Sequence, residues 1–263
     1  MDDLADKRDD ELLESDRYTF YVLRKILHDN NRLLLTDHKS LIICFSGHPY
    51  PVWVWTPDDA PADVMDRAYA LSKEQELLDG THTFNIKRPV GEHFIRRAAE
   101  EGRTMSVKRG MYAYDCPEPI CPKDRADGEM HICTPDDTDA VTEFIAMFHK
   151  EKQFDLKDDE SYREDAVRFI GSGDMFLWKD GQGEYVASCM YDHSGGMASM
   201  HLVYTRPERR RAHYAENLVY RATIRAKAQG FLPTLYTDAG YAASNACYTK
   251  IGYILRGDLC NIG

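Results

Sequence analysis

Four arginines lie close together at Arg206, Arg209, Arg210 and Arg211, where a predicted strand ends and a predicted helix begins. The first turn of a helix has backbone N–H groups without partners, and the helix dipole is positive at that end. Additional guanidinium groups are unfavourable there unless an anion or nearby carboxylates compensate their charge. The segment therefore indicates either an anion site sized for a diphosphate or a solvated basic turn paired with surface carboxylates.

A second candidate pair, Asn245 and Tyr248, lies on a short helix predicted over Ser244–Ile251. Residues three apart share a face of a helix, so the two side chains are expected to point the same way. A phenol with a pKa of about 10 stays protonated at neutral pH and can donate a proton to a thiolate of similar basicity. The alternative is that Tyr248 packs in the core, as Tyr253 is expected to do.

His201 is the candidate proton acceptor on the strand predicted over Met197–Val203, which contains no acidic residue. The period of two along a strand places Ser199, His201 and Val203 on one face. An imidazole accepts a proton near neutral pH and could take one from an ammonium group directly or through water. A purely structural role is the alternative, and Asp192 and His193 at the preceding turn are weaker candidates.

These residues lie in the second half of the chain, which is predicted as β-α-α-β-β-β-α-β-α-β over about 130–263. The long helix expected at Arg209–Gln229 has apolar residues three and four positions apart, which gives it one buried stripe. A final edge strand is expected at Tyr253–Ile262. Alternating strands and helices of this kind predict a mixed sheet covered by helices.

The first half is predicted as two helices followed by β-β-β-α-β-α-β, a smaller α/β domain over 1–115. Prolines and charged residues then indicate a linker over 116–129, which leaves 130–263 as the second domain. Trp53 and Trp55 are expected in the core, with an acceptor pocket as the alternative. The sequence shows no internal repeat.

The segment Arg210-Arg211-Ala212-His213-Tyr214-Ala215 resembles the acyl-CoA motif (Gln/Arg)-x-x-Gly-x-(Gly/Ala) of the GNAT superfamily of N-acetyltransferases. Leu235–Asp238 and Ser244–Tyr253 resemble the next strand and helix of that family, and the element order matches over about 130–263. One residue departs from the pattern, because His213 stands where the family has glycine.

The resemblance implies a GNAT-like mixed sheet with flanking helices, acetyl-CoA as co-substrate, and transfer of the acetyl group by direct attack of an amine. It implies Tyr248 as the general acid, while His201 remains the candidate base. Two-domain members occur in the superfamily, which leaves open that 1–115 is a degenerate relative of the same fold. The alternative function is a non-catalytic acyl-CoA sensor or interaction module. The residues expected to contact acetyl-CoA are Val203, Tyr204, Thr205, Arg210, Arg211, Ala212, His213, Tyr214, Ala215 and Asn245.

The composition limits the kinds of partner that are expected. The chain has 263 residues and a formal net charge of −11, which disfavours nucleic acid and anionic membranes as partners. The acceptor is expected to be an amine on a small molecule or peptide, and a homodimer is left open. The chain has seven cysteines and no CxxC pair, which leads us to expect reduced thiols and no metal. Its N-terminal segment is acidic and does not resemble a signal peptide, so a cytoplasmic location is expected.

Overall fold

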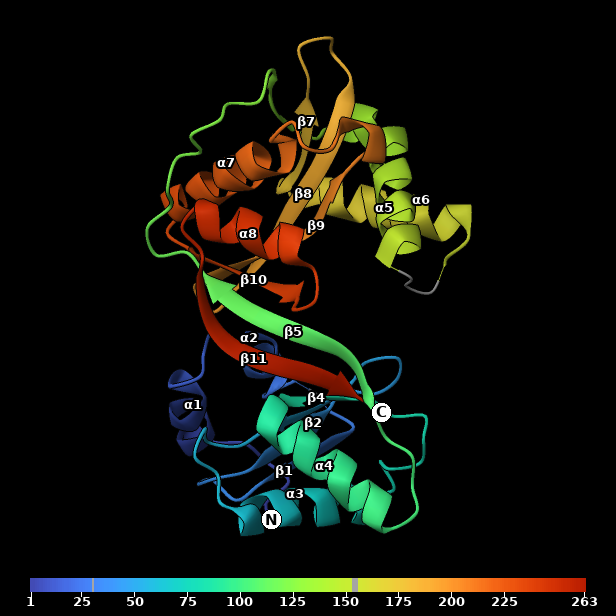
Figure 1. Ribbon diagram of the computed structural model, residues 1–263, viewed down its shortest axis with the longest axis vertical. Coiled ribbons are helices and arrows are strands. Elements are labelled where there is room, and N and C mark those ends of the chain that lie inside the picture. The colour runs from blue at the N-terminus through green and yellow to red at the C-terminus, as the bar shows by residue number, and fades with distance from the viewer. Residues whose placement is uncertain (30, 153–155) are drawn as a thin grey trace. The chain divides into compact units, whose positions relative to one another are not determined.

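The computed structural model describes residues 1–29, 31–152 and 156–263, and they form two compact units (Figure 1). The first unit comprises Met1–Tyr114, Thr237–Tyr241 and Leu255–Gly263, and the second comprises Asp115–Tyr236 and Ala242–Ile254. The mixed α/β class predicted from the sequence is confirmed. The predicted boundaries differ from this division, because Thr237–Tyr241 and Leu255–Gly263 belong to the first unit and the expected linker over 116–129 belongs to the second.

The first unit follows the predicted order of elements. Two short helices come first, and three strands, a helix, a strand, a helix and a strand follow. The bounds are α1 Lys7–Glu14, α2 Tyr21–Ile26, β1 Leu33–Thr36, β2 Ile42–Phe45, β3 Val52–Trp55, α3 Ala62–Glu74, β4 Phe84–Lys87, α4 Arg88–Glu100 and β5 Val107–Asp115.

The sheet of this unit has the strand order β1-β2-β3-β4-β11-β5, in which β11 is Ile254–Ile262. Neighbouring strands are antiparallel from β1 to β3, β3 and β4 are parallel, and β4 and β11 are antiparallel. The expectation of an edge strand at Tyr253–Ile262 is therefore wrong. Leu259, Cys260 and Ile262 are fully buried in β11, as is usual for a strand with neighbours on both sides.

Strand β3 is buried on both faces, which explains why its alternating Val-Trp-Val-Trp pattern does not leave one face in water. Val52 and Val54 belong to a buried cluster that also contains Tyr69 of α3 and Phe94 of α4. Trp53 faces the other way and lies edge-to-face with Phe20, with ring centroids 6.0 Å apart. Both tryptophans are core residues, as expected.

The second unit contains the candidate site. Its strands have the order β10-β9-β8-β7-β6, with β10 and β9 parallel and the other neighbours antiparallel. Helices α5 and α6 pack over one face, where Val141, Phe144 and Ala166 meet Met175, Leu177 and Met190. The bounds are β6 Glu129–Ile132, α5 Thr138–Lys152, α6 Asp159–Gly171, β7 Met175–Lys179, β8 Tyr185–Ser194, β9 Met197–Thr205, α7 Tyr214–Ala228, β10 Leu232–Asp238 and α8 Ala242–Lys250.

The element order β-β-β-α-β-α-β occurs twice along the chain, although the sequence shows no repeat. It runs first from β1 to β5 through α3 and α4, and again from β7 to β11 through α7 and α8. In both series the third and fourth strands are parallel and joined by a helix, β3 with β4 and β9 with β10. Each unit therefore has a place where two parallel strands end side by side, and ligands of α/β proteins commonly bind at such carboxyl ends.

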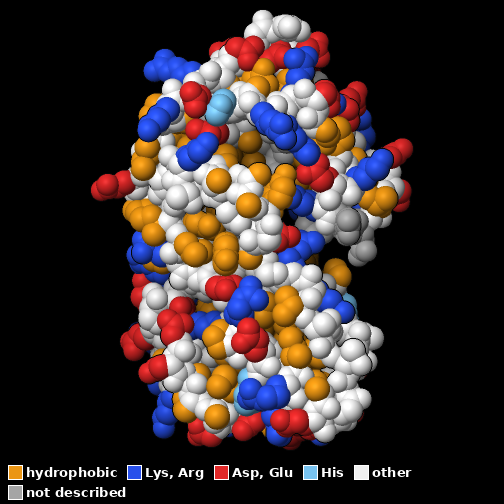
Figure 2. Space-filling model, viewed as in Figure 1, with side chains coloured by type: hydrophobic (Ala, Val, Ile, Leu, Met, Phe, Trp, Pro, Cys, Tyr) orange, Lys and Arg blue, Asp and Glu red, His pale blue; other side chains and the backbone are white. Residues whose placement is uncertain are grey.

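Basic and acidic side chains are interspersed over the face shown in Figure 2, so the net charge of −11 does not appear there as one continuous acidic surface. In the part of the chain that the structure describes, no helix combines the length and apolar character needed to cross a bilayer.

Candidate functional site

The loop between β9 and α7 is irregular where the sequence predicted a helix. Pro207–Arg209 forms a 3-10 turn, Arg210 is extended, and α7 begins only at Tyr214. The predicted start at Arg209 is therefore wrong. Arg211 and His213 both have positive φ, 67° and 61°, and a backbone in the left-handed region cannot continue a right-handed helix.

His213 is the N-cap of α7, with φ 61° and ψ 11°. A left-handed backbone favours glycine, because a side chain there costs about 1 kcal/mol. This accounts for the family's glycine at the position that His213 occupies here. The imidazole lies toward acidic groups, with Nδ1 3.4 Å from Glu216 and Nε2 3.8 Å from Asp124.

The backbone at the start of α7 forms a cradle for an anion. The described residues offer no hydrogen-bond acceptor to the N–H groups of residues 211–216. The α7 dipole is positive at this end, and consecutive open N–H groups beside positive-φ residues are the common form of a phosphate nest. Arg211, Ala212, His213, Tyr214 and Ala215 of the predicted motif all supply such groups.

Most of the positive charge of the four arginines is already compensated by carboxylates. Arg206 forms a bidentate pair with Glu143, and Arg210 is paired with Glu151. Arg209 lies 3.6 Å from Asp180. Arg211 is exposed and has no ion pair among the described residues, so it is the arginine whose charge remains available to an anion. The alternative of a basic turn paired with carboxylates is thus present at three of the four arginines.

Strands β9 and β10 pair only at their beginnings. The register runs from Leu232 opposite Met197 to Leu235 opposite Met200, and β9 then continues to Thr205. Val203 and Tyr204, expected to contact acetyl-CoA, lie in this continuation, and the Thr205 carbonyl accepts a hydrogen bond from Arg210 Nε at 3.1 Å. The strand edge next to β10 is open along this stretch of the described chain.

A bulge in β9 changes which side chains share a face. Leu202 has φ 52°, and the register against β8 shifts between Ser188 and Met190. Leu202 and Tyr204 both pack in the cluster under α5 and α6. Val203 therefore faces the other way, and the prediction that it shares a face with His201 is wrong, because the extra residue breaks the period of two.

Helix α8 carries both predicted residues, Asn245 and Tyr248. Tyr248 is buried, at 6% exposure, and its ring centroid lies 5.9 Å from that of Tyr253. The hydroxyl of Tyr253 shares a hydrogen bond with Thr223 of α7 at 2.8 Å. Lys250 Nζ lies 3.9 Å from Glu216, so α8 reaches the first turn of α7.

His201 lies on the face of the sheet that α6 covers. It stands across from Met190, and its ring centroid is 6.3 Å from that of Phe169 on α6. Its Nε2 is 3.6 Å from Asp192 Oδ1, and its side chain is 43% exposed. His193 is stacked on Phe231 with centroids 4.5 Å apart, which favours a structural role for it.

The segment predicted as a linker supports the loop. Asp127 accepts hydrogen bonds from the Tyr214 hydroxyl at 2.7 Å and from the Gly181 N–H at 2.8 Å. The bond from Tyr214 lowers the pKa of Asp127 and raises the pKa of Tyr214 to about 12. The Asp124 carbonyl accepts from Asn217 at 3.0 Å. No local pattern marks these residues, because their partners are far away in sequence.

The cysteines form no disulfide, and most of them are buried. A possible set of metal ligands lies close together in the sequence at Cys116, Cys121, His131 and Cys133. In the described chain these side chains do not come together as a metal site. Asp6, Asp9 and His38 of the first unit do gather, with potential ligand atoms within 4.8 Å of one another. Their atoms already bond to each other, since His38 Nδ1 is 2.8 Å from Asp9.

Comparison with known proteins agrees with this geometry. A search of the curated proteins finds no match to this sequence. Among solved structures, an acetyltransferase of the GNAT family from Colwellia psychrerythraea is 10% identical, with 99% of this chain and 98% of that chain covered at a TM-score of 0.61. A GCN5-related N-acetyltransferase from Sphaerobacter thermophilus is 13% identical, with 92% and 84% covered at a TM-score of 0.63.

A GCN5-related N-acetyltransferase from Kribbella flavida is also similar, 13% identical over 95% of this chain and 93% of its own, with a TM-score of 0.58. At such identities these structures show a shared fold. The sequence itself matches the acetyltransferase (GNAT) family over residues 139–253, which contain the α7 loop, β9, β10 and α8. Residues 139–253 therefore match the acetyltransferase (GNAT) family, and the chain shares its fold with the solved structures named above.

Proposed function

We propose that the protein transfers the acetyl group of acetyl-CoA to an amine of a small molecule or peptide. The observation that carries the proposal is the row of open backbone N–H groups at residues 211–216, directly after the part of β9 that β10 does not pair with. Such a cradle suits the diphosphate of CoA, and the exposed Arg211 adds a positive charge beside it.

The open edge of β9 suits the rest of the cofactor. Extended backbone at Val203–Thr205 offers hydrogen-bonding groups to the pantetheine chain and to the thioester carbonyl. Asn245 on α8 is proposed to contact the region between pantetheine and diphosphate. Rate enhancement would come mainly from positioning the two reactants and from oriented donors at the carbonyl.

Tyr248 is proposed as the general acid. When an amine attacks the thioester carbon, the carbon–sulfur bond breaks and the sulfur leaves with the electron pair. A buried phenol can protonate that thiolate and spare the cost of releasing it as an anion. His201, exposed and beside Asp192, is the proposed acceptor of the amine's proton.

The second candidate function is an acyl-CoA sensor without turnover. Two observations favour it: Glu143 and Glu151 already pair with arginines of the loop, and His213 replaces the family's glycine. Both reduce the electrostatic and steric fit for a diphosphate. A sensor and an enzyme would share the cradle and differ in whether Tyr248 and His201 do chemistry.

The two functions are separated by measuring binding and turnover on the same preparation. Acetyl-CoA should raise the melting temperature, and a panel of amines should release free CoA, read with a thiol reagent. A shift without turnover for any amine supports the sensor. If acetyl-CoA does not change the melting temperature, both the enzyme and the sensor proposals are wrong. Tyr248→Phe serves as the matched variant, since it keeps the ring and removes only the proton donor.

A further inference from the structure

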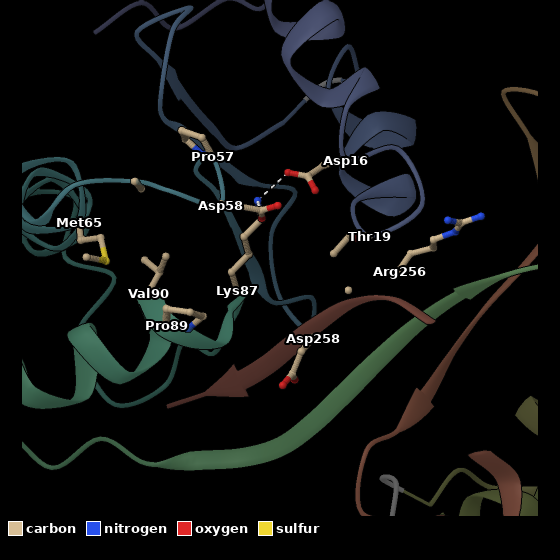
Figure 3. A pocket seen from close by; sticks show the side chains of 12 residues that line it. Asp16, Thr19, Pro57, Asp58, Met65, Lys87, Pro89, Val90, Arg256 and Asp258 are labelled. Atoms are coloured by element: carbon tan, nitrogen blue, oxygen red, sulfur yellow. Dashed lines mark hydrogen bonds and ion pairs between the residues drawn. The ribbon is translucent and has the colours of Figure 1, made fainter. Parts of the chain in front are cut away.

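The first unit contains a cavity of about 290 Å³ at the carboxyl ends of β3 and β4. Figure 3 shows Lys87 rising from the end of β4 between Asp16 and Asp58. Met65 and Val90 lie on one side of the lysine, and Arg256 lies on the other. The volume is near the lower end of the roughly 300–1,000 Å³ that is usual for small-molecule sites.

In the repeated element order, this cavity corresponds to the proposed acyl-CoA site of the second unit. The charged residues around the two sites differ. The loop that leads from β3 to α3 reads Thr56-Pro57-Asp58-Asp59-Ala60-Pro61 and contains two acids and no base. The equivalent loop of the second unit holds four arginines. An acidic loop repels a diphosphate, so the first unit is not built for a second CoA.

Lys87 is the cation at the centre of the cavity. Its side chain is 9% exposed, and its Nζ lies 2.6 Å from Asp16 and 2.6 Å from Asp58. Trp55 and Phe20 lie under the ammonium, with ring centroids 5.8 and 5.7 Å away. A charge this buried needs an anion beside it, because isolated buried charges are very costly.

The two carboxylates that supply that anion are held differently. Asp16 is 15% exposed and also accepts a hydrogen bond from Trp55 Nε1 at 2.8 Å, so it is fixed in the wall. Asp58 is 86% exposed, and Lys87 is its only ion-pair partner among the described residues. An ion pair with so exposed a partner contributes little and can be exchanged.

The surroundings favour an incoming anion with an apolar body. Lys87 is the N-cap of α4, so the positive end of that 13-residue helix lies at the wall. Asp258 of the wall is neutralised by a bidentate pair with Arg88. Met65 and Val90 supply apolar wall.

We propose that this cavity binds a small organic carboxylate with a compact, branched apolar body. The carboxylate of the ligand takes the place of Asp58 on Lys87, and the apolar body packs against Met65 and Val90. Without ligand, the Asp58 carboxylate is paired with Lys87, and it gives up this ion pair when the ligand binds. No covalent bond is made or broken.

The test uses the whole chain and two probes of the same shape and opposite charge, 4-methylpentanoate and 4-methylpentylamine, by calorimetric titration. The carboxylate should bind and the amine should not. Asp58→Asn removes the competitor and should tighten carboxylate binding about two- to fivefold. Lys87→Met should weaken it at least tenfold, because a hydrogen bond to a charged group is lost.

Asp59→Asn is the matched control, since it makes the same charge change in the same loop next to Asp58. It should leave the affinity unchanged. If Lys87→Met unfolds the protein, the comparison of the two exposed asparagine variants, tighter binding for Asp58→Asn and unchanged binding for Asp59→Asn, still tests the proposal. The proposal is overturned if the amine binds in preference, if Asp58→Asn weakens carboxylate binding, or if binding persists in folded Lys87→Met.

Discussion

Arg206 holds Glu143 by two parallel hydrogen bonds, Nη1 to Oε1 at 2.9 Å and Nη2 to Oε2 at 2.8 Å. The pair joins the end of β9 to α5, and the guanidinium also lies 4.9 Å from the ring centroid of Phe144. Arg206 is thereby a structural residue of the second unit. The arginines of the loop divide into those that hold the fold and one, Arg211, that faces water.

This division predicts different outcomes for two arginines that are close in sequence. Arg206→Gln should lower the free energy of unfolding by about 1 kcal/mol and leave acetyl-CoA affinity unchanged. Arg211→Gln should weaken acetyl-CoA binding about three- to tenfold at low salt and leave stability within about 0.5 kcal/mol. Urea unfolding and calorimetric titration measure the two quantities.

Salt provides the control for Arg211. Its contribution comes from an exposed charge, so the difference between wild type and Arg211→Gln should shrink as ionic strength rises to about 1 M. A difference that does not depend on salt would mean that Arg211 acts through the shape of the loop.

Tyr248→Phe should preserve acetyl-CoA binding and lower the rate of acetyl transfer about 100-fold, as expected for loss of a general acid. Tyr253→Phe is the control on the neighbouring ring. It loses the hydrogen bond to Thr223 and should cost about 1 kcal/mol of stability without slowing transfer. Equal turnover of Tyr248→Phe and wild type with a genuine acceptor would rule out the proposed acid.

The left-handed backbone at His213 makes a prediction that compares two substitutions. His213→Gly and His213→Ala both remove the imidazole and its contact with Glu216, but only glycine relieves the strain at φ 61°. The glycine variant should be more stable than the alanine variant by about 0.5–1 kcal/mol. It should also bind acetyl-CoA more tightly than wild type, and unchanged or weaker binding would exclude a steric penalty from the imidazole.

His38 predicts a pH dependence of stability in the first unit. Its Nδ1 lies 2.8 Å from Asp9 and its Nε2 2.7 Å from Asp2, and both nitrogens can donate only when the ring is protonated. Burial lowers the pKa of His38, but the hydrogen bonds to the two carboxylates outweigh it and raise the pKa above 6.5. The resulting stabilisation is complete below pH 6.5 and is lost as pH rises through the folded-state pKa.

Urea unfolding at a series of pH values from 6 to 9 measures this effect. The free energy of unfolding should fall more steeply for wild type than for His38→Asn, since asparagine tolerates the positive φ of 55° and does not titrate. Parallel curves for the two proteins would show that His38 does not titrate in this window.

The sequence by itself determined the order of the elements and the place of the candidate site. Proline and glycine positions, helical spacing and strand alternation are local signals. They predicted β-β-β-α-β-α-β after two helices in the first half and β-α-α-β-β-β-α-β-α-β in the second. The family motif located the loop at Arg210–Ala215 because its spacing depends on one short stretch of backbone. Asn245, the candidate cofactor contact, and Tyr248, the candidate acid, were placed on one helix for the same reason.

Only the tertiary structure decided how the charges of that site are balanced. Glu143 lies 63 residues from Arg206, and Glu151 lies 59 residues from Arg210, so no local pattern links either pair. The bulge at Leu202, the left-handed turn at His213 and the position of β11 beside β4 also follow from packing between distant segments. Local preferences choose a strand or a helix, but the burial of its faces by distant residues decides where it lies and which partners its side chains meet.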